Sequence, residues 1–592
     1  MRWLAVAALS LVLASVASVA AAPSKFDEQL PPGYTAFAPS PDTRIVYVSS
    51  SLGNDSNDGL SDIFPVATLA KGQSLLRNGF PDWLLLRRDD VWVDTLRGWN
   101  RSGGRSTAEP MLLYSYGEGD ERPRILSGTQ EGFRILSTGV SHLAIVGIHF
   151  NAHANTGFSE GGIVIFGPAS DILIEDCLVE HYSANVIVQR FTGAIDNVRL
   201  RRNIIVDAYS TVAHSGGIFI QGATGVTVEE NLFDHNGWRE SDPVAVATVF
   251  NHNVYCQSDA GEDFVFRGNI SARAASHGIQ ARAGGIVEDN LFVRNPLGLQ
   301  FGGGDVPRPG GVTGIAAGNV VLEGTDITPN ALRGNGIEVL NIDPARGAVL
   351  EGNIVSTVAS GRNGFAITCT AKVDGSGAVG VHGLIVQQNI VHDWGLALRL
   401  SGPLLSANVV RDNVFEVNDG ESYLVEYFLG ILPDASAVSY SNNRYESNAA
   451  NLNQLFHVLR LVGDNFEQAS YGFPEWFPVS EETDPVLGVP RFRDPDRSVA
   501  SYHGHLGRPA TFEAFIAGAR AQSRQHYQPE YSAVPVLEYI REGFEEYSPP
   551  VLPEGEVPAS SPAGMALAIG CILAAGTAVI RCRAHLFKMP PR

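Results

Sequence analysis

The chain of 592 residues has few cysteines and few methionines, five and four respectively. No spacing of cysteine and histidine resembles a zinc site. Cys177, Cys256 and Cys369 fall at positions where short apolar segments recur, and the alternation around Cys256 predicts that its thiol points inward. We therefore expect small buried thiols rather than a disulfide framework. This excludes a small extracellular module stabilised by disulfides.

Basic residues are also scarce. The chain has 42 Lys and Arg against 63 Asp and Glu, a formal net charge of −21. Nucleic acid is an unfavourable partner, because its phosphates require clustered cations. The charge also disfavours a strongly anionic polysaccharide, although a local basic patch can override the total. A phosphate-binding glycine loop, a G-x-S-x-G elbow and an H-E-x-x-H helix are all missing from the sequence.

Asparagine, by contrast, recurs in one fixed setting, after a short polar step and before an apolar run. Successive positions lie 21 to 38 residues apart, which a helical repeat of fixed period would not tolerate. A coiled β structure tolerates it, because extra residues can loop out at one corner. The nine positions are Asn203, Asn231, Asn269, Asn290, Asn319, Asn353, Asn389, Asn413 and a degenerate last one, Asn443.

The side chain of asparagine explains this recurrence. It carries both an amide donor and a carbonyl acceptor, and equivalent residues of stacked coils lie about 4.8 Å apart. Identical asparagines can therefore form a hydrogen-bonded ladder from coil to coil. We also expect asparagine to supply the left-handed backbone conformation of the corner. Cys177 and Ile148 fit the same register without an amide, which predicts that apolar packing closes the first coils.

Short alternating strands recur between the asparagine positions. Each opens with Gly or Asn, has apolar second and fourth residues that point to one side, and has third and fifth residues that point to the other. They lie at residues 162–167, 185–190, 217–222, 253–258, 278–283, 298–303, 336–341 and 364–369.

With these two elements the chain resembles the right-handed parallel β-helix proteins of the pectate-lyase-like superfamily, over roughly residues 43–450. The opening segment, residues 46–76, resembles the usual N-terminal cap, with a first strand, an Asp/Asn/Gly-rich turn and a Pro-x-x-Thr approach to a short helix. The resemblance implies an all-β fold, a solenoid with an N-terminal cap and a small helical C-terminal cap. It leaves the reaction open, because the superfamily includes lyases, hydrolases, epimerases and non-catalytic adhesins.

Both ends of the chain predict export. Residues 1–22 read as a secretory signal peptide, with Arg2, an apolar run and a small-residue cleavage site. Residues 563–583 form an apolar segment followed by basic residues, which resembles a sorting signal of the PEP-CTERM type. A plain membrane anchor is the alternative, and in both cases the body lies outside the membrane, on the cell surface or in the extracellular space.

The remaining boundaries follow from composition. Residues 509–544 show helical spacing in two stretches, which we interpret as a cap over the open C-terminal end of the solenoid. The expected organisation is a signal peptide (1–22), an N-terminal cap with first coils (23–130), β-helix repeats (131–450), an irregular region with a helical cap (451–545), a linker (546–562) and a transmembrane or sorting helix (563–583).

Stacking the recurring strands places polar side chains in outward columns. His252 and His277 would lie on adjacent coils about 4.8 Å apart. We expect these two histidines, Tyr255 and Arg282 to be catalytic: histidine or tyrosine can remove a proton beside a uronate carboxylate, and arginine can hold that carboxylate. The expected substrate-binding residues are Phe219, Gln221, Gln257, Gln280 and Gln300. The alternative is that these are ordinary polar residues on the outer surface of a β-helix.

Carboxylate pairs are the other possible source of catalysis, because glycoside hydrolysis uses two acids. Glu229 and Glu230 adjoin a ladder asparagine, and Asp259, Glu262 and Asp263 follow the strand of Tyr255. The last three could be acids, calcium ligands or a solvated turn. Residues 54–59 look like a calcium loop but lack its bidentate glutamate, so we expect no metal and no cofactor.

The sequence thus predicts an exported, monomeric β-helix protein that acts on a polysaccharide, as a lyase or a hydrolase. A non-catalytic polysaccharide-binding or matrix protein on the cell surface is the alternative. The geometry of the predicted site separates them. Catalysis is favoured if His252, Tyr255, His277 and Arg282 converge in a cleft walled by the segments 232–252 and 301–314, and binding if they line an open face.

Overall fold

The structure is a computed structural model, and it describes part of the chain. The described residues are 29–30, 33–137, 139–303, 307–327, 334–358, 364–370, 379–402, 405–417, 423–428, 437–447, 452–462 and 465–546. They belong to one compact unit, except for Glu546, which begins the second. The predicted signal peptide (1–22), linker (546–562) and apolar segment (563–583) lie outside this description, apart from that residue. In the residues that are described, no helix is long and apolar enough to cross a membrane.

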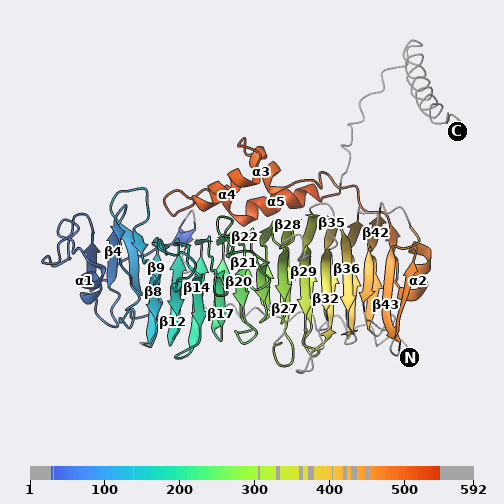
Figure 1. The fold of residues 1–592 in the computed structure, drawn as a ribbon, viewed down its shortest axis with the longest axis horizontal. Coiled ribbons are helices and arrows are strands. Elements are labelled where there is room, and N and C mark those ends of the chain that lie inside the picture. The colour runs from blue at the N-terminus through green and yellow to red at the C-terminus, as the bar shows by residue number, and fades with distance from the viewer. Residues whose placement is uncertain are drawn as a thin grey trace, which may run out of the picture. The chain divides into compact units, whose positions relative to one another are not determined.

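Three long sheets wind around a common core, and each coil contributes one strand to each sheet (Figure 1). Except for a closing hairpin, neighbouring strands in these sheets are parallel. This confirms the predicted all-β, parallel β-helix fold. Sheet 1 contains β3 (Ile45–Val48), β4 (Trp83–Arg87), β6 (Met111–Tyr116), β9 (Val140–Val146), β12 (Ala169–Glu175), β15 (Ile195–Arg201), β18 (Thr224–Glu229), β21 (Val265–Arg267), β24 (Gly285–Glu288), β27 (Gly314–Ala317), β30 (Ala348–Glu351), β34 (Leu384–Gln387), β38 (Asn408–Arg411) and β41 (Val438–Ser441).

The other two sheets follow sheet 1 in each coil. Sheet 2 contains β5 (Val91–Trp92), β7 (Arg124–Leu126), β10 (His149–Asn151), β13 (Leu178–Glu180), β16 (Ile204–Val206), β19 (Leu232–Asp234), β22 (Ile270–Ala272), β25 (Leu291–Val293), β28 (Val320–Gly324), β31 (Ile354–Val358), β35 (Ile390–Trp394), β39 (Val414–Val417), β42 (Arg444–Ser447) and β45 (Val486–Leu487). Sheet 3 contains β8 (Phe133–Ile135), β11 (Gly161–Ile165), β14 (Ala184–Gln189), β17 (Gly216–Gln221), β20 (His252–Cys256), β23 (His277–Ala281), β26 (Leu297–Phe301), β29 (Asn335–Leu340), β32 (Phe365–Thr370), β36 (Leu396–Ser401), β40 (Val425–Phe428), β43 (Phe456–Val462) and β44 (Asn465–Tyr471). Two minor pairs are β1 (Gln29–Leu30) with β2 (Tyr34–Thr35), and β33 (Val381–His382) with β37 (Leu405–Ser406).

The asparagine ladder is present at the corner between sheets 1 and 2. Each side-chain amide from Asn203 to Asn413 donates to the carbonyl oxygen of the next asparagine, at 2.9–3.1 Å. The same oxygen accepts the backbone N–H of the preceding asparagine, as Asn231 does from Asn203 at 2.9 Å. All nine side chains are buried, including the degenerate Asn443. The prediction of a continuous ladder is confirmed.

One detail of the predicted corner is wrong. The left-handed residue is not the asparagine but the residue before it, as in Arg202, Glu230 and Asp289, whose φ angles are 53°, 55° and 53°. Glycine takes this position at Gly268, with φ 63°. The asparagine side chain must point inward to form the ladder, so the preceding residue makes the turn and its own side chain points away from the core.

Groups other than asparagine amides close both ends of the ladder. The first acceptor, Asn203 Oδ1, receives the backbone N–H of Cys177 at 2.9 Å, in the register predicted for that cysteine. The last donor, Asn443 Nδ2, binds the carboxyl group of Glu482 at 2.8 Å. Burial raises the pKa of Glu482, although Asn443 and Tyr445 donate to it. The Glu482 contact therefore satisfies the last free amide of the column.

Different elements close the two ends of the solenoid. At the N-terminal end, α1 (Leu69–Ser74) follows the predicted turn, and Thr68 caps it by accepting from the backbone N–H of Lys71. At the C-terminal end, α2 (Phe473–Ser480) covers the core, and Trp476 stacks on Phe456 with ring centroids 4.7 Å apart. A helical cap is thus present within the segment 451–545.

The helices predicted over 509–544 exist, but they lie elsewhere than expected. They are α4 (Phe512–Arg520) and α5 (Ala533–Gly543), preceded by α3 (Val499–His505) and joined by a short 3₁₀ helix, η2 (Pro529–Tyr531). They lie along the flank of the solenoid over sheet 2 (Figure 1). The hydrophobic effect explains this position, because outward apolar residues of sheet 2, such as Ile204, Leu232 and Leu291, form one buried cluster with the helices. The expectation that these helices cover the open end is therefore wrong.

An arginine also holds the helices α3 to α5, which we call the helical flank, against sheet 2. Arg520 in α4 pairs with Asp207 at 2.6 Å and with Asp234 at 2.5 Å. Asp234 is fully buried and also pairs with Arg273. Burial alone would raise the pKa of Asp207, but hydrogen bonds from His235 and Arg520 outweigh it and hold that pKa well below its usual range.

Removing one ladder amide should destabilise the whole solenoid. In Asn290→Ala, the backbone N–H of Asn269 loses its acceptor, Asn290 Oδ1, and the backbone carbonyl of Phe266 loses the Asn290 side-chain amide inside the core. Each orphaned buried group costs about 1–3 kcal/mol, so we expect a loss of about 3 kcal/mol or more in unfolding free energy, measured by chemical denaturation. The control is Asn78→Ala, which removes one exposed hydrogen bond, to Ser102. Equal effects of both substitutions would contradict the ladder's role.

The depressed pKa of Asp207 makes the flank contacts sensitive to acid. A carboxyl group with a lowered folded-state pKa stabilises the protein above its unfolded pKa, and this contribution is lost as pH falls. As the pH is lowered from 6 to 3, the unfolding free energy of the unchanged protein should therefore fall. That of Asp207→Asn should fall by about 1 kcal/mol less. Asp94→Asn, on an exposed loop, is the matched control and should follow the unchanged protein. Identical pH profiles of Asp207→Asn and the unchanged protein would refute the proposed linkage.

Candidate functional site

The predicted columns of sheet 3 are present in the expected register. His252 pairs with His277 across β20 and β23, Phe219 pairs with Tyr255, and Tyr255 pairs with Gln280. The column formed by the third residues of the recurring strands continues from Gln280 to Gln300. Because the inward residues between them, such as Cys256, are fully buried, the alternation of inward and outward side chains is as predicted.

The two histidines contact each other directly. His277 Nδ1 lies 3.1 Å from His252 Nδ1, and the ring centroids are 4.7 Å apart. Ser276 Oγ lies 2.9 Å from His277 Nδ1, and Gln280 Nε2 lies 3.2 Å from His277 Nε2. His252 and His277 are only 4% and 2% exposed. The pair is therefore a buried hydrogen-bonded unit rather than two surface side chains.

A cavity of about 420 Å³ opens beside this pair on sheet 3. His252 and Tyr255 contribute to its base, with ring centroids 5.1 Å apart. His214 and Phe250, 5.4 Å apart, also line it and come from the loops that precede β17 and β20. The lining residues are Ala184, Ile187, His214, Ser215, Gly216, Ile218, Phe219, Phe250, His252, Tyr255 and Gln257.

The predicted catalytic residues divide into two groups. His252 and Tyr255 line the cavity, and the guanidinium of Arg282 lies over the Tyr255 ring, 4.9 Å from its centroid. His277 lies behind His252 and does not line the cavity. Of the four, only His252 and Tyr255 line the cavity; Arg282 reaches it through its contact with Tyr255, and His277 through its contact with His252.

The predicted substrate-binding residues divide in the same way. Phe219 and Gln257 line the cavity, and Phe219 packs edge-on against Tyr255. Gln221 accepts a hydrogen bond from Gln189 at 2.7 Å on the adjacent outward column. Gln280 and Gln300 are buried and bind each other at 3.0 Å, so they support the histidines instead of facing the cavity.

Sequence reasoning missed His214 and Phe250, which form one wall of the cavity. Phe250 is 61% exposed, so its ring is available to a molecule in the cavity. A signal was present, because both residues lie in long insertions between sheets 2 and 3. The predicted wall from the segment 232–252 is thus present, and none of the described residues 301–303 and 307–314 lines this cavity.

The carboxylates considered as alternative acids are held by other groups. Glu229 pairs with Arg267 at 2.9 Å, and Glu262 pairs with Arg346 at 2.6 Å. Asp259 accepts the backbone N–H of Gly222, in the turn after β17, and Asp263 accepts that of Gly225, at the start of β18. Glu230 pairs with Arg202. These residues stabilise turns and do not line the cavity.

One close carboxyl pair was not expected from the sequence. Glu131 and Glu160 lie at the N-terminal end of sheet 3, four and three coils from His252, respectively. The hydrogen bond with Glu131 raises the pKa of Glu160. Arg97 and Arg134 pair with Glu131, at 3.2 and 2.7 Å. At about 4.8 Å per coil, Glu160 lies roughly 14 Å and Glu131 roughly 19 Å from His252, outside the cavity.

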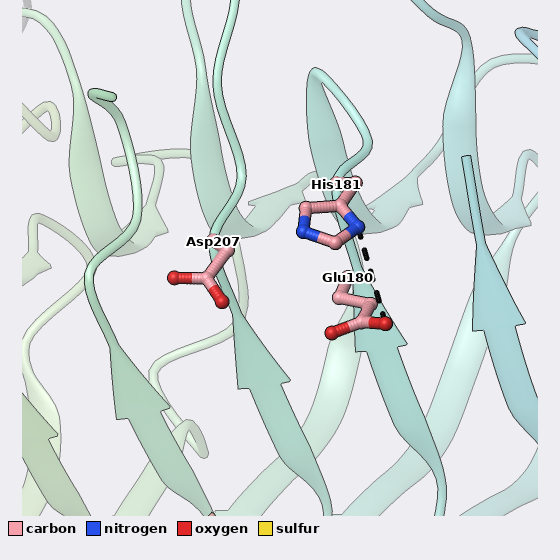
Figure 2. A group of neighbouring side chains, drawn as sticks. All are labelled: Glu180, His181 and Asp207. Carbon is pink, nitrogen blue, oxygen red and sulfur yellow. Dashed lines mark ion pairs between the residues drawn. The ribbon is translucent and has the colours of Figure 1, made fainter. Parts of the chain in front are cut away.

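A cluster on sheet 2 has the composition of a metal site. Glu180, His181 and Asp207 offer ligand atoms within 4.8 Å of one another, from the ends of neighbouring strands (Figure 2). However, both Asp207 oxygens accept from Arg520, and one also contacts His235 at 2.8 Å. Glu180 accepts from Asn151 and contacts His149. The guanidinium beside Asp207 supplies the positive charge that a cation would bring, so these residues do not favour a metal ion.

A family model for the right handed beta helix region matches residues 131–307 of this chain. Among curated protein sequences, none matches it. Several solved structures share the fold at low sequence identity. A lacto-N-biosidase of glycoside hydrolase family 136 from Eubacterium ramulus is 15% identical, with a TM-score of 0.36, and the match covers 75% of this chain and 68% of the enzyme.

Two further structures have similarly low sequence identities and TM-scores. An alginate lyase from Paenibacillus sp. str. FPU-7 is 13% identical, with a TM-score of 0.33, over 63% of this chain and 94% of the lyase. A mutant tailspike protein of E. coli bacteriophage HK620, in complex with a hexasaccharide, is 14% identical, with a TM-score of 0.38, over 68% of this chain and 71% of the tailspike. The family match and the three stacked parallel sheets identify the fold as a right-handed parallel β-helix.

Proposed function

We propose that the cavity on sheet 3 binds a polysaccharide that contains uronate residues and cleaves it by β-elimination. The observation that carries this proposal is that His252 and Tyr255 line one cavity with aromatic walls, while the guanidinium of Arg282 lies over the Tyr255 ring. Aromatic rings such as Phe219 and Phe250 suit the apolar faces of sugar rings, and Gln257 can exchange hydrogen bonds with hydroxyls.

The three polar residues match the needs of the reaction. Elimination removes the proton beside the uronate carboxylate, forms a carbon–carbon double bond and breaks the glycosidic C–O bond, whose oxygen then takes a proton. Arg282 would hold the carboxylate and stabilise the negative charge that develops there. Tyr255 and His252 would transfer the two protons, since both lie at the base of the cavity.

Hydrolysis is a weaker interpretation of the same cavity. It requires two carboxyl groups on either side of the glycosidic bond. The described residues that line the cavity include no carboxylate. Glu131 and Glu160 do not line it either. They lie four and three coils from His252, respectively.

Catalysis is favoured over simple binding by the position of His252. It is 4% exposed and lies at the base of a cavity with a raised wall, and a flat binding face would not need a buried histidine pair. Export, predicted from residues 1–22, would bring the protein to an extracellular polysaccharide, and it remains a prediction. We likewise propose that the protein lies on the cell surface and is monomeric.

A panel of uronate-containing and neutral polysaccharides tests this proposal, with unsaturated ends followed by ultraviolet absorbance and reducing ends by a chemical assay. We expect both signals to rise together for a uronate polymer. Tyr255→Phe and His252→Ala should each lower kcat by about 100-fold or more, since each removes a proton-transfer group. Arg282→Ala should lower kcat/KM by at least about tenfold, because it removes the carboxylate contact.

The matched control is Arg411→Ala, an exposed arginine of sheet 1 that binds Gln387 and lies outside the cavity. It should keep full activity. Reducing ends without unsaturated ends would show hydrolysis and contradict the elimination. Retention of a polysaccharide without any cleavage would support the non-catalytic alternative.

A further inference from the structure

The histidine pair continues into a chain of hydrogen bonds that ends at a backbone carbonyl. Gln300 Nε2 donates to the carbonyl oxygen of Gly302 at 3.1 Å. Gln280 Nε2 donates to Gln300 Oε1 at 3.0 Å and lies 3.2 Å from His277 Nε2. His277 Nδ1 lies 3.1 Å from His252 Nδ1. Four side chains of three successive coils are thus connected in one line.

The carbonyl of Gly302 fixes the direction of every bond in this line. A backbone carbonyl can only accept, so Gln300 must present its NH₂ group to it, and its side-chain oxygen then faces Gln280. That oxygen in turn requires the NH₂ group of Gln280, whose second hydrogen points to His277 Nε2. Rotating either amide would bring two oxygen acceptors together.

The direction of these bonds determines the tautomer of each histidine. His277 Nε2 accepts, so the proton of the neutral ring lies on Nδ1. This N–H points to His252 Nδ1, and it can be shared with Ser276 Oγ at 2.9 Å. In either case His252 Nδ1 carries no proton, because two N–H groups 3.1 Å apart would repel each other. His252 therefore carries its proton on Nε2.

We propose that Gln280, Gln300 and the Gly302 carbonyl are positioning groups that hold His252 as the Nε2–H tautomer, so that His252 donates a hydrogen bond to the molecule in the cavity and does not act as the base. This deepens the proposed function and rests on it for the substrate. His252 would give the proton to the leaving oxygen or hold a carboxylate oxygen, and removal of the substrate proton would belong to Tyr255.

A buried orphan acceptor supports a role beyond stability. Gln280 is 5% exposed, and its Oε1 has no hydrogen-bond partner among the described residues. An unsatisfied buried oxygen destabilises a fold, and an apolar residue of the same shape would avoid it. Gln280 is therefore a poor choice for packing alone, and a suitable one for orienting His277.

Nitrogen NMR of the full chain, labelled with ¹⁵N-histidine, tests the tautomers without any substrate. The two rings are assigned from His252→Gln and His277→Gln proteins. At neutral pH we expect His252 as Nε2–H and His277 as Nδ1–H. The second result is diagnostic, because free histidine prefers the Nε2–H form. A His252 ring with its proton on Nδ1, or with two protons, would overturn the proposal.

Gln280→Met removes the donor at nearly constant volume, and Gln221→Met is the matched control, since Gln221 binds Gln189 and lies outside the histidine line. In Gln280→Met, the Nε2 signal of His252 should move away from that of a protonated nitrogen, whereas Gln221→Met should leave it unchanged. An unchanged His252 spectrum in folded Gln280→Met would refute the positioning role.

Enzyme kinetics, where a substrate is found, add a second readout. Gln280→Met should lower kcat by about tenfold with little change in KM, because the donor in the transition state is lost while the cavity keeps its shape. The tautomer measurement stands apart from these kinetics. A protein that cleaves no polysaccharide but shows the expected tautomers would contradict the proposed function alone.

Discussion

Buried amides at one corner set the register of this solenoid. Each asparagine of the ladder satisfies its neighbour's donor and acceptor, and each is buried where water cannot substitute. A shift of one coil by one residue would leave several polar groups unsatisfied and turn the outward residues of every following strand inward. The ladder therefore fixes which side chains lie beside each other on the other two sheets. The contact between His252 and His277, 25 residues apart in the chain, depends on that register.

Sheets 2 and 3 carry different surfaces, and this difference places the candidate site. Over sheet 2, apolar outward residues such as Leu291 and Val320 are covered by α4 and α5. The described part of sheet 3 has an aromatic and amide surface instead, beside a cavity. The helices α4 and α5 thus bury the apolar outward residues of sheet 2 and leave the polar outward residues of sheet 3 accessible to a ligand.

The sequence predicted the columns because their physics is local and repetitive. Alternation gives the face of each strand, and the asparagines give the alignment, so His252, Tyr255 and Gln280 could be placed before any coordinates. The cavity wall could not be predicted, since Phe250 and His214 lie in insertions whose paths depend on tertiary packing. Similarly, the roles of Gln280 and Gln300 depend on whether each side chain is buried, which alternation alone does not tell.

The position of the helices was predicted wrongly although a signal was present. After most ladder asparagines the chain runs through consecutive apolar residues, as in Ile204, Ile205 and Val206. A strand with one face in water would alternate, so such a run indicates burial on both faces. After the last ladder asparagine, Asn443, the polar residue Arg444 replaces the first apolar residue. Among the described residues, the helices α3 to α5 do not pack on this coil. Reading these triplets as doubly buried would have placed the helices over sheet 2.

The way the ladder ends has a consequence for how such a protein changes in length. Its amides all point one way, from the backbone N–H of Cys177 to the carboxyl group of Glu482. Any interior coil receives one set of bonds and gives an identical set, so gain or loss of a whole coil leaves the balance of donors and acceptors intact. The terminal coils lack this equivalence. Duplication should therefore be tolerated in the middle of the solenoid and not at its two boundaries.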